Sequence, residues 1–248
     1  MEFSSPRLIE VNSDIIEYDI KHANTSLMRY YDLYPSEKLD AIDKMSKAKR
    51  EYTVGMLCRD DKSLSKKLLK SFDDIMTTFL ETNDLTEDDL LSIKKDAAFV
   101  INRKVKTRIF GCVEFAIKNI YCAYIKIPCY EFYIKKDKTT DVKGIGDRDA
   151  LDLHKSGILE FVNTVVELYS KQDAEELSEY LHEFVEAYKK RELPFEYYRE
   201  FNSQSAYITY DEIGGTVVLD DMDESMIDDI DITFNYMNVI LPIIRVVL

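Results

Sequence analysis

Two aspartates stand in otherwise apolar stretches of the sequence, and carboxylates are preferred ligands of divalent metal ions. Asp19 lies in Ile15-Ile-Glu-Tyr-Asp-Ile20, and Asp96 directly precedes the run Ala97–Ile101. An unpaired charge in such surroundings costs several kcal/mol, so each acid needs a cation, a hydrogen-bond network or solvent. If the fold brings the two acids together, they could hold a pair of metal ions for phosphoryl transfer.

The pattern of apolar residues predicts that both acids lie at the ends of strands. Strands are predicted at Leu8–Val11 and Ile15–Ile20, and a helix begins near Ser26, so Asp19 falls at a strand-to-helix junction. Asp96 falls at the bend of a predicted hairpin, in a turn that lacks the Gly preferred by two-residue primed turns. The other predicted strands are Leu91–Lys94, Ala97–Ile101, Cys112–Ile117, Ile120–Ile127, Tyr130–Ile134, Ala206–Tyr210 and Thr216–Leu219.

Helical spacing predicts an insertion between the two acids. It covers residues 36–82, with one helix from Ser36 to Ala48 and another from about Ser63 to Glu81. Two more helices are predicted around Ile158–Leu168 and Leu177–Tyr188, and the chain closes with an acidic loop and an apolar tail interrupted by Pro242.

Charge and cysteine content narrow the class of protein. A formal net charge of −14 over 248 residues disfavours non-specific coating of nucleic acid, because Lys and Arg supply most of that affinity. Residues 94–143 are nevertheless rich in Lys and Arg, so a polyanion could approach there, whereas residues 211–231 are almost wholly acidic.

The four cysteines lack metal-site spacing and indicate buried or half-buried thiols in a reducing compartment. With neither a signal-peptide pattern nor an apolar run long enough for a bilayer, we expect a cytoplasmic protein with no membrane partner.

The segment Asp19–Met28 resembles motif A of family B DNA polymerases, Asp-x-x-Ser-Leu-Tyr-Pro-Ser-Ile-Met. Asp19, Ser26 and Met28 match it without gaps, while Ala23 and Asn24 stand where that family has Leu and the ribose-contacting Tyr. Lys94-Lys-Asp-Ala-Ala-Phe-Val100 is similar to the palm hairpin Asp-Thr-Asp-Ser-x-x-Val, with Asp96 on the second Asp and Lys94 in place of the first.

Three further segments follow the order of the same family. Lys47 and Gly55 have the separation of the fingers-helix pattern, although its Asn, Ser and Tyr are not matched. Lys118-Asn-Ile-Tyr121 resembles the Lys-Lys-x-Tyr primer-template contact, and Asp141-Val-Lys-Gly-Ile145 resembles the segment that leads into the thumb. The five segments span roughly residues 15 to 150, and an exonuclease region is absent.

The resemblance implies a divergent nucleotidyltransferase that uses two-metal phosphoryl transfer. Asp19 and Asp96 would be the catalytic residues and would hold Mg²⁺ or Mn²⁺. Lys47 and Arg50 would bind the nucleoside triphosphate. Contacts with nucleic acid would come from Lys118, Tyr121 and Lys143.

The implied fold is α+β: a palm-like antiparallel sheet, a helical fingers-like insertion at about residues 36–82, and a mostly helical thumb-like C-terminal part. The domains would be residues 1–145, the palm-like core with its insertion, and residues 146–248, the thumb-like region with an acidic loop. The composition suggests a viral or phage product that acts in the host cell cytoplasm.

A non-catalytic interpretation also fits the sequence. Asp19 could cap the following helix or pair with Lys21, and Asp96 could be an ordinary turn acid. The chain would then be an acidic viral interaction protein, either a decayed polymerase fold or a modulator of a basic partner that handles nucleic acid. The separation of the two carboxylates distinguishes these hypotheses, because metal ions cannot bridge distant acids.

Overall fold

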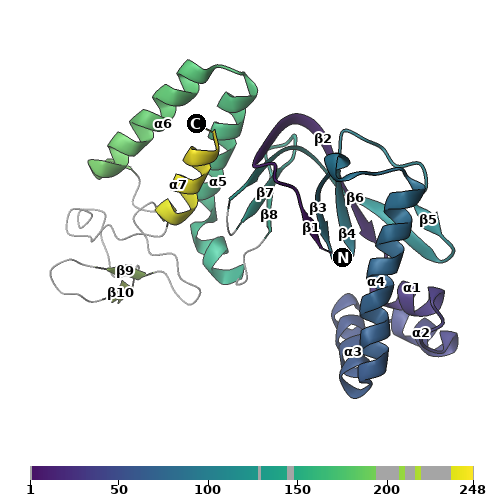
Figure 1. Cartoon of the computed structure of the whole chain (residues 1–248). Helices are drawn as coiled ribbons and strands as arrows, with labels where there is room; N and C mark the ends of the chain where they lie inside the picture. Colours follow the sequence, from purple (N-terminus) through teal and green to yellow (C-terminus); the bar gives the residue numbers. More distant parts are fainter. Residues whose placement is uncertain are drawn as a thin grey trace. The chain divides into compact units, whose positions relative to one another are not determined.

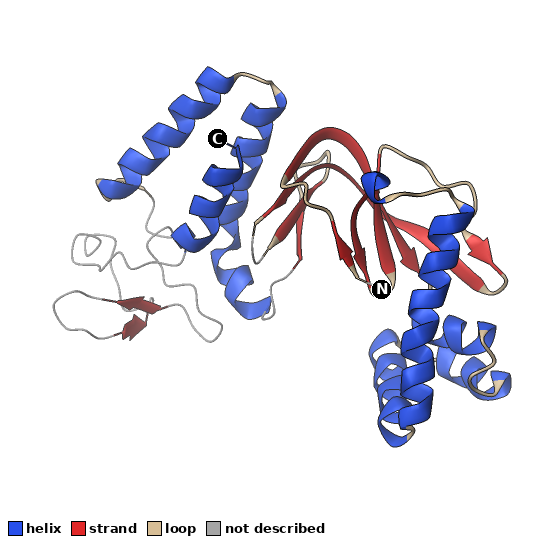
Figure 2. Cartoon of the chain, in the orientation of Figure 1, coloured by secondary structure: helices blue, strands red, loops and turns tan. Residues whose placement is uncertain are grey.

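The computed structural model describes residues 2–127, 130–143, 148–193, 207–209, 216–218 and 236–247. It consists of helices and antiparallel strands, which confirms the predicted α+β class (Figure 2). The chain forms two compact units: the first contains Met1–Pro6 and Ser13–Tyr121, and the second contains Arg7–Asn12 and Cys122–Leu248. The domain boundary predicted near residue 145 stays a prediction.

The first unit is built on a sheet with the strand order β1-β3-β4-β2-β6, and β5 pairs with β6 (Figure 1). Its strands are β1 (Phe3–Ser4), β2 (Ile9–Ile20), β3 (Leu90–Lys94), β4 (Ala97–Ile101), β5 (Ile109–Phe110) and β6 (Val113–Lys126). The two longest strands, β2 and β6, each extend into the second unit. The predicted hairpin of β3 and β4 is confirmed, with Lys94 paired to Ala97 across the turn that contains Asp96.

The sequence predicted two separate strands for β2 and two for β6, and the structure shows that each is one continuous strand. In β2 the polar segment from Asn12 to Asp14 continues the strand, because Asn12 adopts the left-handed φ of 55° that Asn tolerates. In β6 the polar residues Lys118 and Asn119 bind carboxylates of β2, so they remain within the strand.

The helices of the first unit are α1 (Ala23–Tyr30), α2 (Ser36–Asp43), α3 (Lys47–Asp60) and α4 (Lys62–Thr82), followed by the short 3₁₀ helix η1 (Glu87–Asp89). Helix α4 packs on the sheet, and α1 and α3 contact α4 (Figure 1). The predicted helix from Ser36 to Ala48 is in fact two, α2 and α3, whereas α4 agrees with its prediction within one residue at each end. Phe79 of α4 stacks on Phe115 of β6 with ring centroids 4.1 Å apart.

Alternation along β2 separates a packed face from the face that carries chemistry. Ile16, Tyr18 and Ile20 belong to the apolar cluster beneath α4. Because successive strand residues point to opposite faces, Glu17 and Asp19 lie on the other side of the sheet. Burial of the first set thus fixes the orientation of the second.

The second unit continues with β7 (Glu131–Ile134) and β8 (Thr140–Lys143), which extend β6 in antiparallel order. Its helices are α5 (Arg148–Ser170), α6 (Ala174–Lys189) and α7 (Tyr236–Val247), and its remaining strands β9 (Tyr207–Thr209) and β10 (Thr216–Val218) pair with each other. Helix α5 packs against α6 and α7. The predicted apolar tail forms α7, and Pro242 lies within this helix. Ile240, Ile243 and Val247 are buried on its packed face.

Three of the four cysteines lie within the described residues, and Cys58, Cys112 and Cys122 carry free thiols, as predicted. Cys112 is exposed, however, and not buried or half-buried. Across the described ranges, no helix combines the length and apolar character needed to cross a membrane. The predicted acidic loop and the fourth cysteine, Cys129, lie outside the described residues.

Candidate active site

The two predicted acids lie together on neighbouring strands. Asp19 stands near the end of β2 opposite Ala97 of β4, and the backbone N–H of Ile20 donates a 3.0 Å hydrogen bond to the carbonyl oxygen of Asp96. Burial raises the pKa of Asp96, and the charge of Asp19 raises it further. The two carboxylates are therefore close enough to repel each other.

Both acids line one pocket of about 240 Å³ in the first unit. Three basic side chains that the sequence predicted for substrate binding, Lys47, Arg50 and Lys118, line the same pocket. The rest of its wall comes from Ile20, His22, Ala23, Asn24, Thr25 and Glu51. Five of the seven predicted site residues thus share one polar pocket.

Lys118 of β6 binds two carboxylates of β2. Its Nζ lies 2.8 Å from Oδ2 of Asp19 and 3.5 Å from Oε1 of Glu17. Burial acts to lower the pKa of Lys118, but the hydrogen bonds and charges of these carboxylates outweigh it and raise the pKa. Asp19 does not pair with Lys21, whose Nζ lies 2.8 Å from Oε1 of Glu114. An internal cation therefore neutralises Asp19.

Glu17 is a buried carboxylate that sequence reasoning missed. It is 1% exposed, and its Oε2 accepts hydrogen bonds from Nδ2 of Asn119 at 2.6 Å and from the hydroxyl of Tyr121 at 2.8 Å. Tyr121 is itself fully buried, so in this structure it supports Glu17 and has no surface to offer a nucleic acid. The signal for Glu17 was its spacing of two residues from Asp19, which places both carboxylates on one face of the strand.

Lys143 is not among the residues that line the pocket. It ends β8 in the second unit, where it is paired opposite Glu131 and is half-buried. Its contact with nucleic acid stays a prediction.

Lys47 and Arg50, two basic residues of α3, differ in whether a carboxylate pairs with their charge. Lys47 is 81% exposed and lies 3.9 Å from Oε1 of Glu51, a loose ion pair that solvent screens. Arg50 is half-buried, and in the described part of the chain no carboxylate pairs with its guanidinium. A guanidinium has five N–H donors, and one that no carboxylate of the described residues engages is suited to bind a phosphate.

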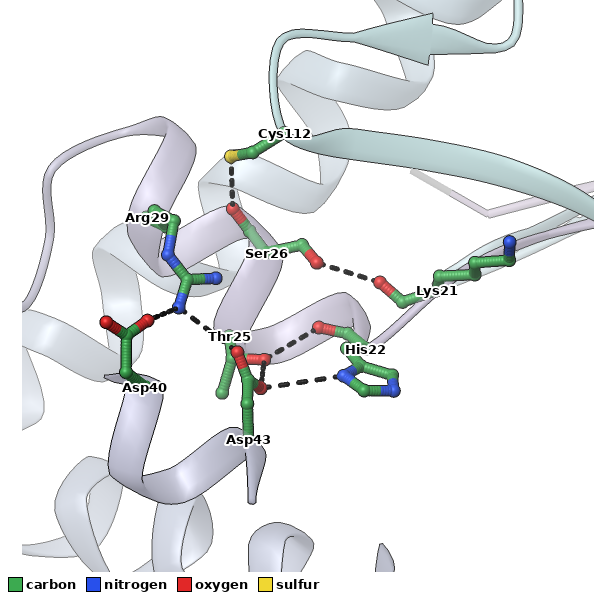
Figure 3. A network of polar contacts seen from close by, with 8 residues as sticks. All are labelled: Lys21, His22, Thr25, Ser26, Arg29, Asp40, Asp43 and Cys112. Atoms are coloured by element: carbon green, nitrogen blue, oxygen red, sulfur yellow. Dashed lines mark hydrogen bonds and ion pairs between the residues drawn. The ribbon is translucent and has the colours of Figure 1, made fainter. Parts of the chain in front are cut away.

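The junction that follows Asp19 is held by a polar network (Figure 3). His22 adopts a left-handed φ of 48° immediately before α1, which begins three residues earlier than the predicted Ser26 start. The Ser26 hydroxyl donates to the carbonyl oxygen of Lys21 at 2.8 Å, so the matched motif residue closes the turn. This turn directs His22, Ala23 and Asn24 to the pocket wall.

Helix α2 anchors the same junction through Asp43. Its Oδ1 accepts a 2.5 Å hydrogen bond from the Thr25 hydroxyl, and its Oδ2 accepts a 3.1 Å bond from the guanidinium of Arg29 (Figure 3). Burial acts to raise the pKa of Asp43, but these two donors outweigh it and lower the pKa below its ordinary value of 3.8.

We expect Asp43→Asn to destabilise the fold at neutral pH by about 1.5–3 kcal/mol, the usual contribution of hydrogen bonds to a charged group. Because the folded pKa is lowered, the stabilisation is present above pH 3.8 and is lost as the pH falls through the folded pKa. Urea unfolding at pH 7 and near pH 3 measures this, with Asp40→Asn as control. Asp40 binds the same Arg29 but is 65% exposed, so its loss should cost less than about 0.5 kcal/mol. An equal effect of both variants at pH 7 would contradict the assignment.

The acid pair fits a magnesium or manganese ion that is bound together with a phosphate-bearing substrate. Within the described ranges, no group of three or more His, Cys, Asp or Glu residues could hold a metal alone. Mg²⁺ is commonly bound by one or two carboxylates, and waters and substrate phosphates complete its octahedron. Asp19 and Asp96 supply two carboxylates to one pocket. Burial and then the charge of Asp19 raise the pKa of Asp96, and a cation between the two acids would relieve the second of these effects.

The fold is similar to that of a family B DNA polymerase from the hyperthermophilic archaeon Pyrobaculum calidifontis, with a TM-score of 0.54 and 10% sequence identity. The match covers 99% of this chain and 46% of the polymerase, so the chain spans about half the length of this neighbour. At this identity the likeness shows the fold alone. A family model described as Bacteriophage PBS1 gene 130 protein matches residues 5–248.

The chain therefore belongs to the Bacteriophage PBS1 gene 130 protein family. This membership agrees with the predicted viral or phage origin. A search of curated proteins finds no match.

Proposed function

We propose that this protein is a divergent polymerase-like nucleotidyltransferase that extends a nucleic-acid primer in the host cytoplasm. The observation that carries the proposal is the shared pocket, in which Asp19 and Asp96 lie together with Lys47, Arg50 and Lys118. Two repelling carboxylates beside three cations are suited to a substrate that arrives as a metal-bound triphosphate. The likeness to a family B polymerase fold supports this proposal.

In the proposed reaction, the 3′ oxygen of the primer attacks the α-phosphorus of a nucleoside triphosphate. A phosphorus–oxygen bond forms, the bond to pyrophosphate breaks, and the hydroxyl proton leaves to solvent. Asp19 and Asp96 would hold Mg²⁺ or Mn²⁺, which would activate the attacking oxygen and stabilise the leaving pyrophosphate. Arg50 and Lys47 would bind the triphosphate, while Lys118 and Lys143 would contact the nucleic acid.

The test is primer extension and untemplated nucleotide addition with Mg²⁺ or Mn²⁺. Native protein should incorporate nucleotide, and Asp19→Ala or Asp96→Ala should reduce incorporation roughly a hundredfold or more, because several kcal/mol of charge stabilisation are lost. Asp14→Ala, an exposed acid on the same strand, is the matched control and should retain activity. If native protein shows no metal-dependent incorporation, the catalytic proposal fails.

A specific observation favours a second, non-catalytic function. Lys118 neutralises Asp19 at 2.8 Å, and Lys94 replaces the first acid of the palm-hairpin pattern, so part of the acid site is compensated internally. A chain with a net charge of −14 could then act by binding a basic protein that handles nucleic acid. In that case, native protein and the Asp96→Ala variant would bind the same partner equally, and neither would incorporate nucleotide.

A further inference from the structure

Helix α4, which is labelled in Figure 1, has several exposed lysines in its N-terminal half. We define the lysine face as Lys62, Lys66, Lys67 and Lys70, all of which are exposed. Lys62, Lys66 and Lys70 recur every four residues and so lie along one side of the helix over about 12 Å. The buried side of the helix, which includes Leu64, Leu68 and Phe72, is the opposite one.

Among the described residues, no carboxylate pairs with any member of the lysine face. Some exposed lysines elsewhere do pair with carboxylates, as in Lys138–Glu167 and Lys189–Glu186, whereas others, such as Lys104 and Lys106, pair with no described carboxylate. The lysine face differs from these single side chains because its lysines are aligned along one helix. This alignment concentrates positive charge where an external anion can approach.

The arrangement opposes the stability of the helix that carries it. A helix N-terminus is electropositive and favours acids, and Asp61 caps α4 in this way. The N-terminal half of the helix nevertheless carries the lysines, while its C-terminal half carries Asp73, Asp74 and Glu81. Like charges four residues apart, such as Lys62 and Lys66, add repulsion. Local rules are commonly violated in this way where a residue serves a ligand.

Lys95, the residue before Asp96, contacts a different side of α4. Its Nζ lies 4.5 Å from the ring centroid of Phe72, which belongs to the buried side of the helix. The proposed binding surface is therefore the lysine face of α4 alone.

We propose that the lysine face binds the phosphodiester backbone of a nucleic-acid strand. The choice of nucleic acid as the ligand rests on the proposed function. The chemistry of the surface favours nucleic acid over a protein, because protein interfaces have apolar cores and few lysines, whereas nucleic-acid interfaces are polar and positively charged. Leu69, which is 56% exposed, is the one large apolar side chain on this segment of α4 that the structure describes as exposed.

The test is the salt dependence of binding to a short fluorescein-labelled primer–template, measured by fluorescence anisotropy between about 50 and 200 mM salt. The variant is Lys62→Gln/Lys66→Gln/Lys70→Gln, since Gln preserves helix propensity. We expect affinity to fall at least about tenfold at the low-salt end and the slope of log K against log salt to fall by roughly 2–3, in proportion to three lost phosphate contacts. The melting temperature of the variant should equal or exceed that of the native protein, because repulsion between lysines of α4 is relieved.

The matched control is Lys138→Gln/Lys171→Gln/Lys189→Gln, which changes the net charge equally but removes lysines that are already paired with carboxylates. It should change affinity by at most about twofold. Equal losses in both triple variants, or unchanged binding in the α4 variant, would overturn the proposal. If native protein incorporates no nucleotide but the α4 variant still loses binding selectively, the lysine face stands and only the catalytic proposal fails.

Discussion

Asp96→Asn is expected to stabilise the protein at pH 7 while it abolishes divalent-metal binding. Burial and then the charge of Asp19 raise the pKa of Asp96 above its ordinary value of 3.8, so ionising this carboxyl costs folding free energy. The cost is absent below pH 3.8 and complete once the pH has risen through the folded pKa. Asparagine removes it, and we expect a gain of about 0.5–2 kcal/mol, or roughly 2–4 °C in melting temperature per kcal/mol for a chain of this length.

The stabilisation should have a pH signature and a matched control. The difference in melting temperature between Asp96→Asn and native protein should shrink toward zero as the pH is lowered to 3.8. Asp19→Asn should not stabilise, because it removes the hydrogen-bonded partner of Lys118, yet it should lose metal binding equally. If both variants lower the melting temperature at pH 7 by the same amount, the proposed repulsion between the two acids is wrong.

Lys118→Met is expected to strengthen divalent-metal binding and to weaken the apo fold. The native ammonium lies 2.8 Å from Asp19 and repels any divalent cation that approaches this carboxylate. Without it, we expect Mn²⁺ affinity to rise about tenfold, equivalent to ~1.4 kcal/mol. The apo protein should lose about 1–3 kcal/mol, because the buried carboxylate of Glu17 loses its cation but keeps Asn119 and Tyr121 as donors.

Isothermal titration with Mn²⁺ and thermal unfolding with and without Mn²⁺ measure these two effects. Mn²⁺ should raise the melting temperature of Lys118→Met more than that of native protein, because the metal replaces the missing cation. Lys118→Arg keeps the positive charge and should behave like native protein in both measurements. Unchanged or weaker Mn²⁺ binding by Lys118→Met would show that Lys118 does not compete for the metal position.

Sequence reasoning succeeded where local periodicity is strong and failed where partners come from distant segments. Helix α4 was predicted within one residue at each end because its buried apolar positions recur without a break from Leu64 to Phe79, over roughly four turns. Strand β6 was predicted as two strands because Lys118 and Asn119 interrupt its apolar pattern. Their ligands, Asp19 and Glu17, lie about a hundred positions earlier and cannot be found by local pattern alone.

The candidate site shows the same division. The sequence predicted that Asp19 and Asp96 lie together, because each stands at the end of a strand pattern. Each also resembles one of the two polymerase motifs whose aspartates hold metal together. Tyr121 could also be matched to a motif, but a motif does not reveal which face of a strand is buried, and Tyr121 proves fully enclosed. Glu17 was missed because a single acid between Ile16 and Tyr18 has no local sign of its hydrogen-bond partners.

The central claim is that Asp19 and Asp96 together bind divalent metal. Anomalous scattering from Mn²⁺ in crystals grown with a nucleoside triphosphate tests this claim most directly. The predicted result is an anomalous peak within about 2.2 Å of a carboxylate oxygen of each aspartate, with Nζ of Lys118 moved away from Asp19. The contradicting result is no peak at the two carboxylates, or a peak elsewhere, with Lys118 still bound to Asp19 at Mn²⁺ concentrations that saturate metal-dependent polymerases.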